Sequence, residues 1–231
     1  MNSIQAHFSK TISDYDTIVD NIVFKNDELH KELIKAIPFN ENKEISVLDL
    51  GCGTGHGMKL LANQFPKAQI TGIDFSPIMI NKAQKNLSAF SDRIELLEAD
   101  FNDHKPSKKF DVIISAIAIH NIPHEQKRSL FTKIFNSLND NGVFVNADFY
   151  EHDSQIINQQ LKKRYESFLR HNLSGDELKV WLKHAFEEDM PMTLSEQFSI
   201  LEVAGFQQIN LTWIFNNEAI YIAEKQPNSP Q

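Results

Sequence analysis

The segment VLDLGCGTG at residues 47–55 constrains the fold more than any other, because it places three glycines directly behind a short apolar run. The run at residues 45–50 contains one polar residue, Asp49, and predicts a buried strand. Residues 56–65 have the apolar spacing of a helix and end before Pro66. A glycine turn between a strand and a helix N-terminus lets a ligand approach free N–H groups, so this segment predicts a nucleotide-like binding site.

Strand-like and helix-like segments alternate beyond the turn. The expected strands are residues 68–74, 93–100, 110–120 and 142–150, and the expected helices are residues 76–90, 124–140 and 193–205. Two last strand-like segments meet at Asn216-Asn217, which predicts a hairpin. This order predicts an α/β fold with a seven-stranded, mostly parallel sheet, helices on both faces and an antiparallel C-terminal hairpin.

Capping signals mark three helix starts. Ser76 precedes Pro77 as an N-cap, SGDE at residues 174–177 and the pair Thr193 and Glu196 form capping-box patterns, and Gly205 predicts a helix stop. We divide the chain on these signals. The expected parts are an N-terminal helical lid (1–40), a core (41–151 and 193–225), a helical insertion (152–192) and a disordered tail (226–231).

The charge balance argues against nucleic acid as a partner. The 231 residues carry 23 basic and 31 acidic side chains, a formal charge of −8. The basic clusters at residues 104–109 and 162–164 are short and are typical of solvated surface. A cationic small ligand would meet a mildly favourable field.

Cysteine content and hydropathy indicate which metal sites, disulfides and membrane segments to expect. The single cysteine, Cys52, permits no internal disulfide and cannot build a zinc site alone, so we expect no metal site. No apolar stretch approaches 18 residues, and the N-terminus lacks the basic start and apolar region of a secretory signal. We expect a cytoplasmic protein with no membrane span.

Acidic residues follow the expected strands where a nucleotide-like ligand needs them. The pyrophosphate fingerprint fails, because the position three residues after Gly53 is His56. Asp74 closes the second expected strand and can accept hydrogen bonds from a ribose, while Asp100, followed by Phe101, closes the third and could meet an adenine. Each acid alone is equally a cap or loop residue, but together they mark the carboxyl edge of the sheet.

Five segments in order resemble the motifs of one enzyme family. VLDLGCGTG, ITGIDFSPIMI, EADF, FDVIISAIAIHNI and LNDNGVFVNADF resemble the successive motifs of the class I S-adenosylmethionine-dependent methyltransferases of small-molecule type. The match covers residues 45–150, and the two terminal strands also fit that fold. The resemblance implies a Rossmann-like fold and S-adenosyl-L-methionine as the cofactor.

The resemblance also implies cofactor contacts. The glycine backbone would lie under the methionine part, Asp74 would hold the ribose, and Asp100 with Phe101 would hold the adenine. The full implied set is Asp49, Gly51, Cys52, Gly53, Gly55, Asp74, Phe75, Met79, Asp100, Phe101, Ser115 and Ala116. The N-terminal HFSKTISDYD resembles a lid in which Tyr15 touches the cofactor under cover of Phe8, although a surface helix explains the same residues.

Methyl transfer from a sulfonium is an in-line displacement, so positioning supplies most of the catalysis. If the acceptor must lose a proton, His120 or Tyr150 is the candidate catalytic residue, and Asp148 would lie beside them at the pocket mouth. A capping or packing role explains His120 equally well.

The acceptor predicted from the sequence is a small molecule. The Asn/Asp-Pro-Pro-aromatic motif of base-amine methylation is replaced by SAIA at residues 115–118. His120 and Asp148 are candidate substrate contacts as well. The insertion adds Arg164 and Trp181, with core or solvent positions as the alternatives. Two other functions stay open: a cofactor-modifying enzyme resembling the carboxy-S-adenosylmethionine synthases of tRNA modification, and a non-catalytic cofactor-binding subunit. A homodimer is also compatible with the sequence.

Overall fold

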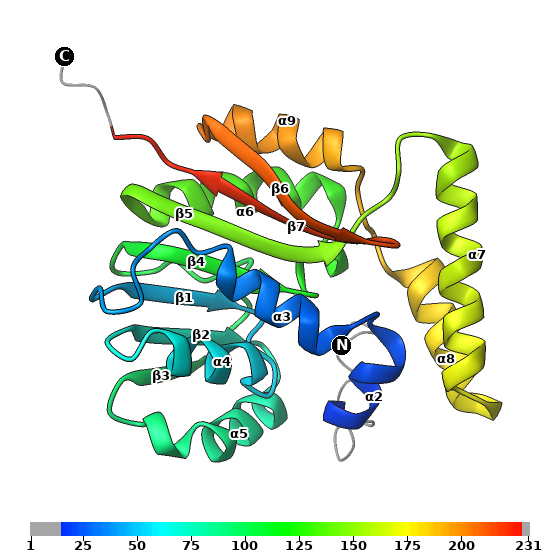
Figure 1. Ribbon diagram of the computed structural model, residues 1–231, viewed down its shortest axis with the longest axis horizontal. Coiled ribbons are helices and arrows are strands. Elements are labelled where there is room, and N and C mark those ends of the chain that lie inside the picture. Colours follow the sequence, from blue (N-terminus) through cyan, green and yellow to red (C-terminus); the bar gives the residue numbers. More distant parts are fainter. Residues whose placement is uncertain (1–14, 228–231) are drawn as a thin grey trace.

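The computed structural model describes residues 15–227, with side chains from Ile18 onward. Within that range the strands form one sheet in the order β3-β2-β1-β4-β5-β7-β6 (Figure 1). The strands are β1 (Ser46–Leu50), β2 (Gln69–Asp74), β3 (Ile94–Glu98), β4 (Phe110–Ala116), β5 (Leu138–Phe149), β6 (Gln208–Phe215) and β7 (Glu218–Glu224). The predicted seven-stranded α/β fold is therefore confirmed.

Strand direction places the ligand crevice. β1 pairs in parallel with β2 and β4, and β3 and β5 extend the parallel part on either side. β7 runs antiparallel between β5 and β6, as the C-terminal hairpin predicts. The chain reverses its order at β1, with β2 on one side and β4 on the other. Ligands in open α/β sheets bind beyond the carboxyl ends of the strands at such a point.

Helices cover both faces of the sheet. They are α2 (Tyr15–Ile22), α3 (Asn26–Lys35), α4 (His56–Gln64), α5 (Pro77–Asn86), α6 (His124–Ser137), α7 (Gln155–Asn172), α8 (Gly175–Lys183) and α9 (Leu194–Ala204), with 3₁₀ turns at Ser88–Phe90 and Ile119–Asn121 and a π-helical turn at His184–Glu188. Helices α3 and α4 pack together on one face, and α6 and α9 pack together on the other (Figure 1). Among the described residues, two large apolar clusters, one for each face, and a small third cluster of Tyr150, Leu161 and Ala219 make up the core.

The helices of the insertion stand at the carboxyl edge of the sheet, at the right of Figure 1. Helix α7 packs against α2 and α8. The Tyr165 hydroxyl on α7 donates a hydrogen bond of 2.8 Å to the Ile22 carbonyl oxygen at the end of α2. The insertion and the N-terminal helices therefore meet beside the crevice, although they are more than 100 residues apart in sequence.

Several local signals act as the sequence predicts. Thr193 and Glu196 form the complete capping box of α9, and Gly205 ends that helix with φ +117°. The Ser76 side chain accepts a hydrogen bond from the Met79 N–H, with Pro77 as the first residue of α5. Asn216 turns the hairpin with φ +53°. Each of these signals depends only on residues a few positions apart, so the sequence alone is enough to predict where the helix or turn begins or ends.

Three local predictions are wrong. Ser174 stands at the N-cap of α8 as predicted, but its side chain makes no capping hydrogen bond, and the first helical residue, Gly175, has φ +59°. Helix α6 ends at Ser137 and not at residue 140, because Leu138 already pairs with Phe110 of β4. Strand β4 ends at Ala116 and not at residue 120, because the chain turns into the 3₁₀ turn at Ile119–Asn121.

Some predictions fall outside the described part of the chain. Phe8 and residues 228–231 of the predicted tail are not described, and Tyr15 begins α2 without a described side chain. The contact predicted for Tyr15 therefore stays a prediction. Among the described residues, no helix combines the length and the apolar character needed to cross a bilayer.

Candidate active site

The glycine turn after β1 has a geometry that only glycine adopts readily. Gly51, Gly53 and Gly55 have φ angles of +78°, +53° and +85°. A Cβ atom on Gly51 would lie 2.7 Å from the Ala118 Cβ, so packing closes that position. A Cβ atom on Gly53 would meet no described heavy atom within 4 Å. Gly53 therefore faces open space, and this is the space where a ligand can approach the backbone.

A cavity of about 500 Å³ opens over this turn. Its walls come from α2 and α3, the glycine turn and the carboxyl end of β4. The lining residues include Val19, Asp20, Asn26, Asp27, His30, Asp49, Gly51, Cys52, Gly53, Gly55, Ala116 and Ile117. This volume falls in the usual range for small-molecule sites. Six of the residues predicted from the resemblance thus share one cavity: Asp49, Gly51, Cys52, Gly53, Gly55 and Ala116.

Two buried carboxyl groups sit below and beside the turn. Burial and the charge of Asp74 raise the pKa of Asp49 to about 7. The Asp74 carboxylate accepts hydrogen bonds of 2.9 Å from the N–H groups of Gly53 and Ser76. Burial raises the pKa of Asp74, although these two hydrogen bonds act to lower it. Asp74 therefore fixes the turn, and a cationic group in the cavity would favour the ionised form of Asp49.

The two residues predicted to hold the adenine, Asp100 and Phe101, lie in different surroundings. Asp100 is exposed, and its carboxylate accepts a hydrogen bond of 2.8 Å from the Asn102 N–H. Phe101 is buried in the apolar core with Leu50 and Ile73, so its ring supports the turn from below. This position does not favour the stacking role predicted for Phe101. The two remaining candidates lie after β2, with Phe75 half-buried and Met79 buried.

The carboxyl end of β4 forms one wall of the cavity. The Ser115 hydroxyl donates a hydrogen bond of 3.0 Å to the Leu50 carbonyl oxygen, so Ser115 is buried and joins β4 to β1. Ile117 lines the cavity with φ +51°, a strained conformation for a β-branched residue. Its N–H donates a hydrogen bond of 2.8 Å to the Ala147 carbonyl oxygen, which holds the strained turn in place. Such strain concentrates at functional sites.

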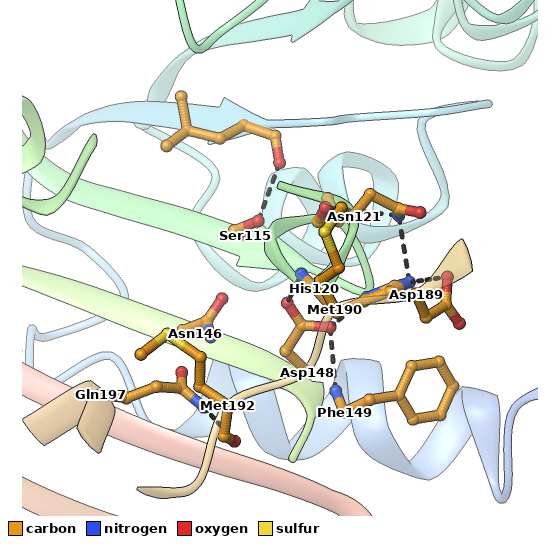
Figure 2. Close-up of polar contacts among 12 residues, drawn as sticks. Ser115, His120, Asn121, Asn146, Asp148, Phe149, Asp189, Met190, Met192 and Gln197 are labelled. Carbon is orange, nitrogen blue, oxygen red and sulfur yellow. Dashed lines mark hydrogen bonds and ion pairs between the residues drawn. The ribbon is translucent and has the colours of Figure 1, made fainter. Parts of the chain in front are cut away.

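His120 is buried between acidic groups (Figure 2). Its Nδ1 lies 2.5 Å from Asp148 Oδ1, its Nε2 lies 3.6 Å from Asp189 Oδ1, and its N–H donates to Asp148 Oδ2 at 2.9 Å. Burial acts to lower the pKa of His120, but Asp148 and Asp189 more than offset this, so the pKa is raised. His120 is not among the residues that line the cavity. This environment favours the packing role of His120 over the general-base role.

The other candidate catalytic and substrate residues lie away from the cavity. The Tyr150 hydroxyl donates a hydrogen bond of 3.1 Å to the Asn216 carbonyl oxygen, and burial raises its pKa. Trp181 is buried in the apolar cluster that also contains Tyr165, which favours its core role. Arg164 is exposed on α7. The substrate contacts predicted for His120, Asp148, Arg164 and Trp181 stay predictions.

Sequence reasoning missed three sets of residues. Asn26, Asp27 and His30 of α3 line the cavity, but α3 carries no motif that would have singled them out. Asp189 faces His120 from a distance of 69 positions in sequence, which no periodicity reveals. Glu218 begins β7 fully buried, and only its place beside the hairpin turn could have drawn attention to it.

A family model described as a methyltransferase domain matches residues 41–202. The chain belongs to this methyltransferase domain family. The matched range contains every strand of the parallel part of the sheet and the glycine turn. The enzyme class predicted from the sequence, an S-adenosylmethionine-dependent methyltransferase, is therefore confirmed at the level of the family.

Two curated relatives of this methyltransferase carry different names. It is 26% identical over 203 residues to the carboxy-S-adenosyl-L-methionine synthase of Nautilia profundicola, covering 87% of this chain and 85% of the relative. It is 29% identical over 188 residues to the malonyl-[acyl-carrier protein] O-methyltransferase of a Paenibacillus species, covering 78% of this chain and 67% of the relative.

Solved structures share the fold. An O-methyltransferase family protein from Burkholderia thailandensis matches with a TM-score of 0.73 and 13% identity, over 97% of this chain and 63% of that chain. The DhpI-SAH complex matches with a TM-score of 0.68 and 17% identity, over 97% of this chain and 96% of that chain. Several matched structures are longer, and the chain spans about 60% of the length of the first of them.

Proposed function

We propose that this methyltransferase binds S-adenosyl-L-methionine in the cavity over the glycine turn and transfers the methyl group to a small-molecule acceptor. The observation that carries the proposal is the open space at Gly53, on the wall of a cavity of about 500 Å³. A ligand can lie against the backbone there without displacing protein atoms.

Asp49 lines the cavity, whereas Asp74 is not among its lining residues and lies beside the glycine turn, where it accepts a hydrogen bond from Gly53. We assign the methionine part to the glycine turn, the ribose to Asp74 and the positive end to Asp49. Asp74 donates no hydrogen bond when ionised, and its carboxylate oxygens have lone pairs beyond those used by Gly53 and Ser76. The cofactor, when bound, supplies an activated methyl group. The residues of this chain bind it, orient it and exclude water from it.

The proposed acceptor is a small molecule and not a macromolecule. The formal charge of −8 and the missing amine-methylation motif at residues 115–118 both support this assignment. We place the binding site for the methyl acceptor in the insertion, because α7 and α8 stand at the carboxyl edge of the sheet beside the N-terminal helices. No general base is assigned, since His120 is buried with both ring nitrogens beside polar groups.

A second candidate function is favoured by one observation. The match to carboxy-S-adenosyl-L-methionine synthase covers most of both chains, at 26% identity. An enzyme of that kind modifies the cofactor itself. Incubation with S-adenosyl-L-methionine and a metabolite extract, followed by mass spectrometry, would reveal a cofactor that carries an additional carboxyl group. Such a product would replace the methyl-transfer proposal.

The experiment that tests the cofactor assignment is a calorimetric titration. We expect S-adenosyl-L-methionine and S-adenosylhomocysteine to bind with a Kd in the micromolar range, and NAD and ATP to leave that binding unchanged. The physical reason is that the pyrophosphate fingerprint is missing while Asp74 is present. Binding of NAD in place of both adenosyl compounds would contradict the proposal.

A further inference from the structure

His120 joins two parts of the molecule that are far apart in sequence. It sits in the 3₁₀ turn after β4, Asp148 lies near the end of β5, and Asp189 follows the π-helical turn of the insertion. Figure 2 shows His120 between the two carboxylates. The side chains of His120, Asp148 and Asp189 are all nearly fully buried. Removing such groups from water is costly unless opposite charges face each other.

Backbone hydrogen bonds show that the contact holds a segment and not only a side chain. The Met190 N–H donates a hydrogen bond of 3.0 Å to the His120 carbonyl oxygen. The Lys127 ammonium on α6 donates to the Met190 carbonyl oxygen. The imidazole of His184 lies 3.3 Å from the same Asp189 oxygen that faces His120. One carboxylate oxygen of the insertion is therefore shared by two imidazoles, one from the core and one from the insertion.

The charge balance of this cluster depends on the His120 proton. Asp148 and Asp189 face the ring, and the Asn121 amide nitrogen lies 3.0 Å from its Nε2. In the imidazolium form this amide is turned so that its oxygen accepts a hydrogen bond from the Nε2–H. The Phe149 ring packs edge-on against it at 5.0 Å. The charge of Lys127 acts against protonation of the ring. When the His120 imidazolium loses one of its two ring protons, two buried carboxylates face a neutral ring.

The remaining titratable neighbours among the described residues are Glu196, Tyr165, Tyr221 and Glu188, and none of them can carry a positive charge. The charge of Glu196 acts to raise the pKa of Lys127. The charge of Asp189 acts to raise the pKa of Tyr165, and the charge of Asp148 acts to raise the pKa of Tyr221. Burial raises the pKa of both tyrosines, so they stay neutral near pH 7. Glu188 pairs with Lys183 at 2.9 Å and lies 3.3 Å from His184, at the outer end of the cluster.

We propose that the His120 imidazolium is the positioning group that fixes the insertion on the carboxyl edge of the sheet, and that loss of its proton loosens residues 184–190. The consequence for acceptor binding rests on the proposed function of the insertion. The contact between His120 and Asp189 does not depend on that function, because it is formed by side chains of this chain alone.

The sign of the pH dependence follows from linkage. The folded-state pKa of His120 is raised above 6.5, so its contribution is fully present below that value and is lost as the pH rises through the folded pKa. A fully coupled proton changes a local opening constant by about tenfold per pH unit in that window. A general base would have the opposite effect on turnover, since its activity rises as it loses its proton.

The test is amide hydrogen exchange of the whole, cofactor-free protein across this pH window, corrected for intrinsic exchange. We expect the protection of residues 184–190 to fall by up to about tenfold per pH unit above 6.5. Residues 56–64 of α4 serve as the internal reference, and their protection stays constant. Constant protection of residues 184–190 over the same window would overturn the proposal.

Three variants sharpen the test. His120→Gln removes the proton, so residues 184–190 exchange fast at every pH. Asp189→Asn keeps the shape of the partner and weakens the pH dependence, and it decides the question with the wild-type profile if His120→Gln does not fold. His171→Gln removes an exposed histidine of α7 and leaves the profile unchanged. A wild-type pH profile in the Asp189→Asn variant would also overturn the proposal.

Discussion

The open space at Gly53 leads to a prediction with a matched control. Gly53 and Gly175 have nearly the same φ, +53° and +59°, and a Cβ atom on either would meet no described heavy atom within 4 Å. Replacing either glycine by alanine therefore costs about the same strain, ~1–2 kcal/mol for a left-handed residue. Only Gly53 lines the cavity over the glycine turn. The two variants differ in the cavity and not in the backbone penalty.

We expect Gly53→Ala to weaken S-adenosylhomocysteine binding while Gly175→Ala does not. In the complex the added methyl group would enter space that the ligand fills. Such overpacking costs about 1–3 kcal/mol, which is about 5- to 150-fold in Kd. Isothermal titration gives the two Kd values, and thermal unfolding shows whether the variants lose similar stability. Wild-type affinity in a folded Gly53→Ala protein would refute the placement of the ligand. So would an equal loss of affinity in Gly175→Ala.

Three further predictions follow from buried groups. Asp74→Asn removes the negative charge that we assign to the ribose and that also accepts hydrogen bonds from two backbone N–H groups. S-adenosylhomocysteine should therefore bind at least about tenfold more weakly in calorimetry. An unchanged Kd would contradict the assignment. Burial raises the pKa of Glu218 well above 4.5, so ionisation lowers stability by up to about 1.4 kcal/mol per pH unit above that value. Glu218→Gln should therefore be more stable than the wild type in denaturant at pH 8 but not at pH 4, and a variant weakened at both values would count against this reasoning. Trp181→Ala should lower the free energy of unfolding by about 3–5 kcal/mol, because the ring is buried, yet leave cofactor affinity within a few-fold. Loss of cofactor binding in a folded Trp181→Ala protein would contradict the division between core and insertion.

The parts of the fold that the sequence predicted correctly are those with local or periodic signals. The glycine turn, the capping box at Thr193 and the hairpin at Asn216 each depend on a few adjacent residues. The start of β5 does not. Leu138 pairs with Phe110, and Asn139 donates a hydrogen bond of 2.9 Å to Asp111, so a strand replaces the expected last turn of the helix. Helical periodicity cannot reveal pairing with a residue so far away.

The candidate site divides in the same way. Gly53 and Asp49 could be predicted because the motif itself places them on the cavity. Phe101 could not, because the side of the sheet on which its ring packs depends on Leu50 and Ile73. His120 was noticed from its place after β4, but its partner Asp189 comes from the insertion. Its charge state therefore depends on tertiary packing that the sequence does not show.

Transfer of a labelled methyl group tests the central claim most directly. The protein is incubated with methyl-labelled S-adenosyl-L-methionine and a fractionated metabolite extract, and the label is followed by mass. The account predicts label in a low-molecular-weight product that is not itself an S-adenosyl compound, and much less of it with the Gly53→Ala variant at low cofactor concentration. Label found only in RNA or protein would contradict the account.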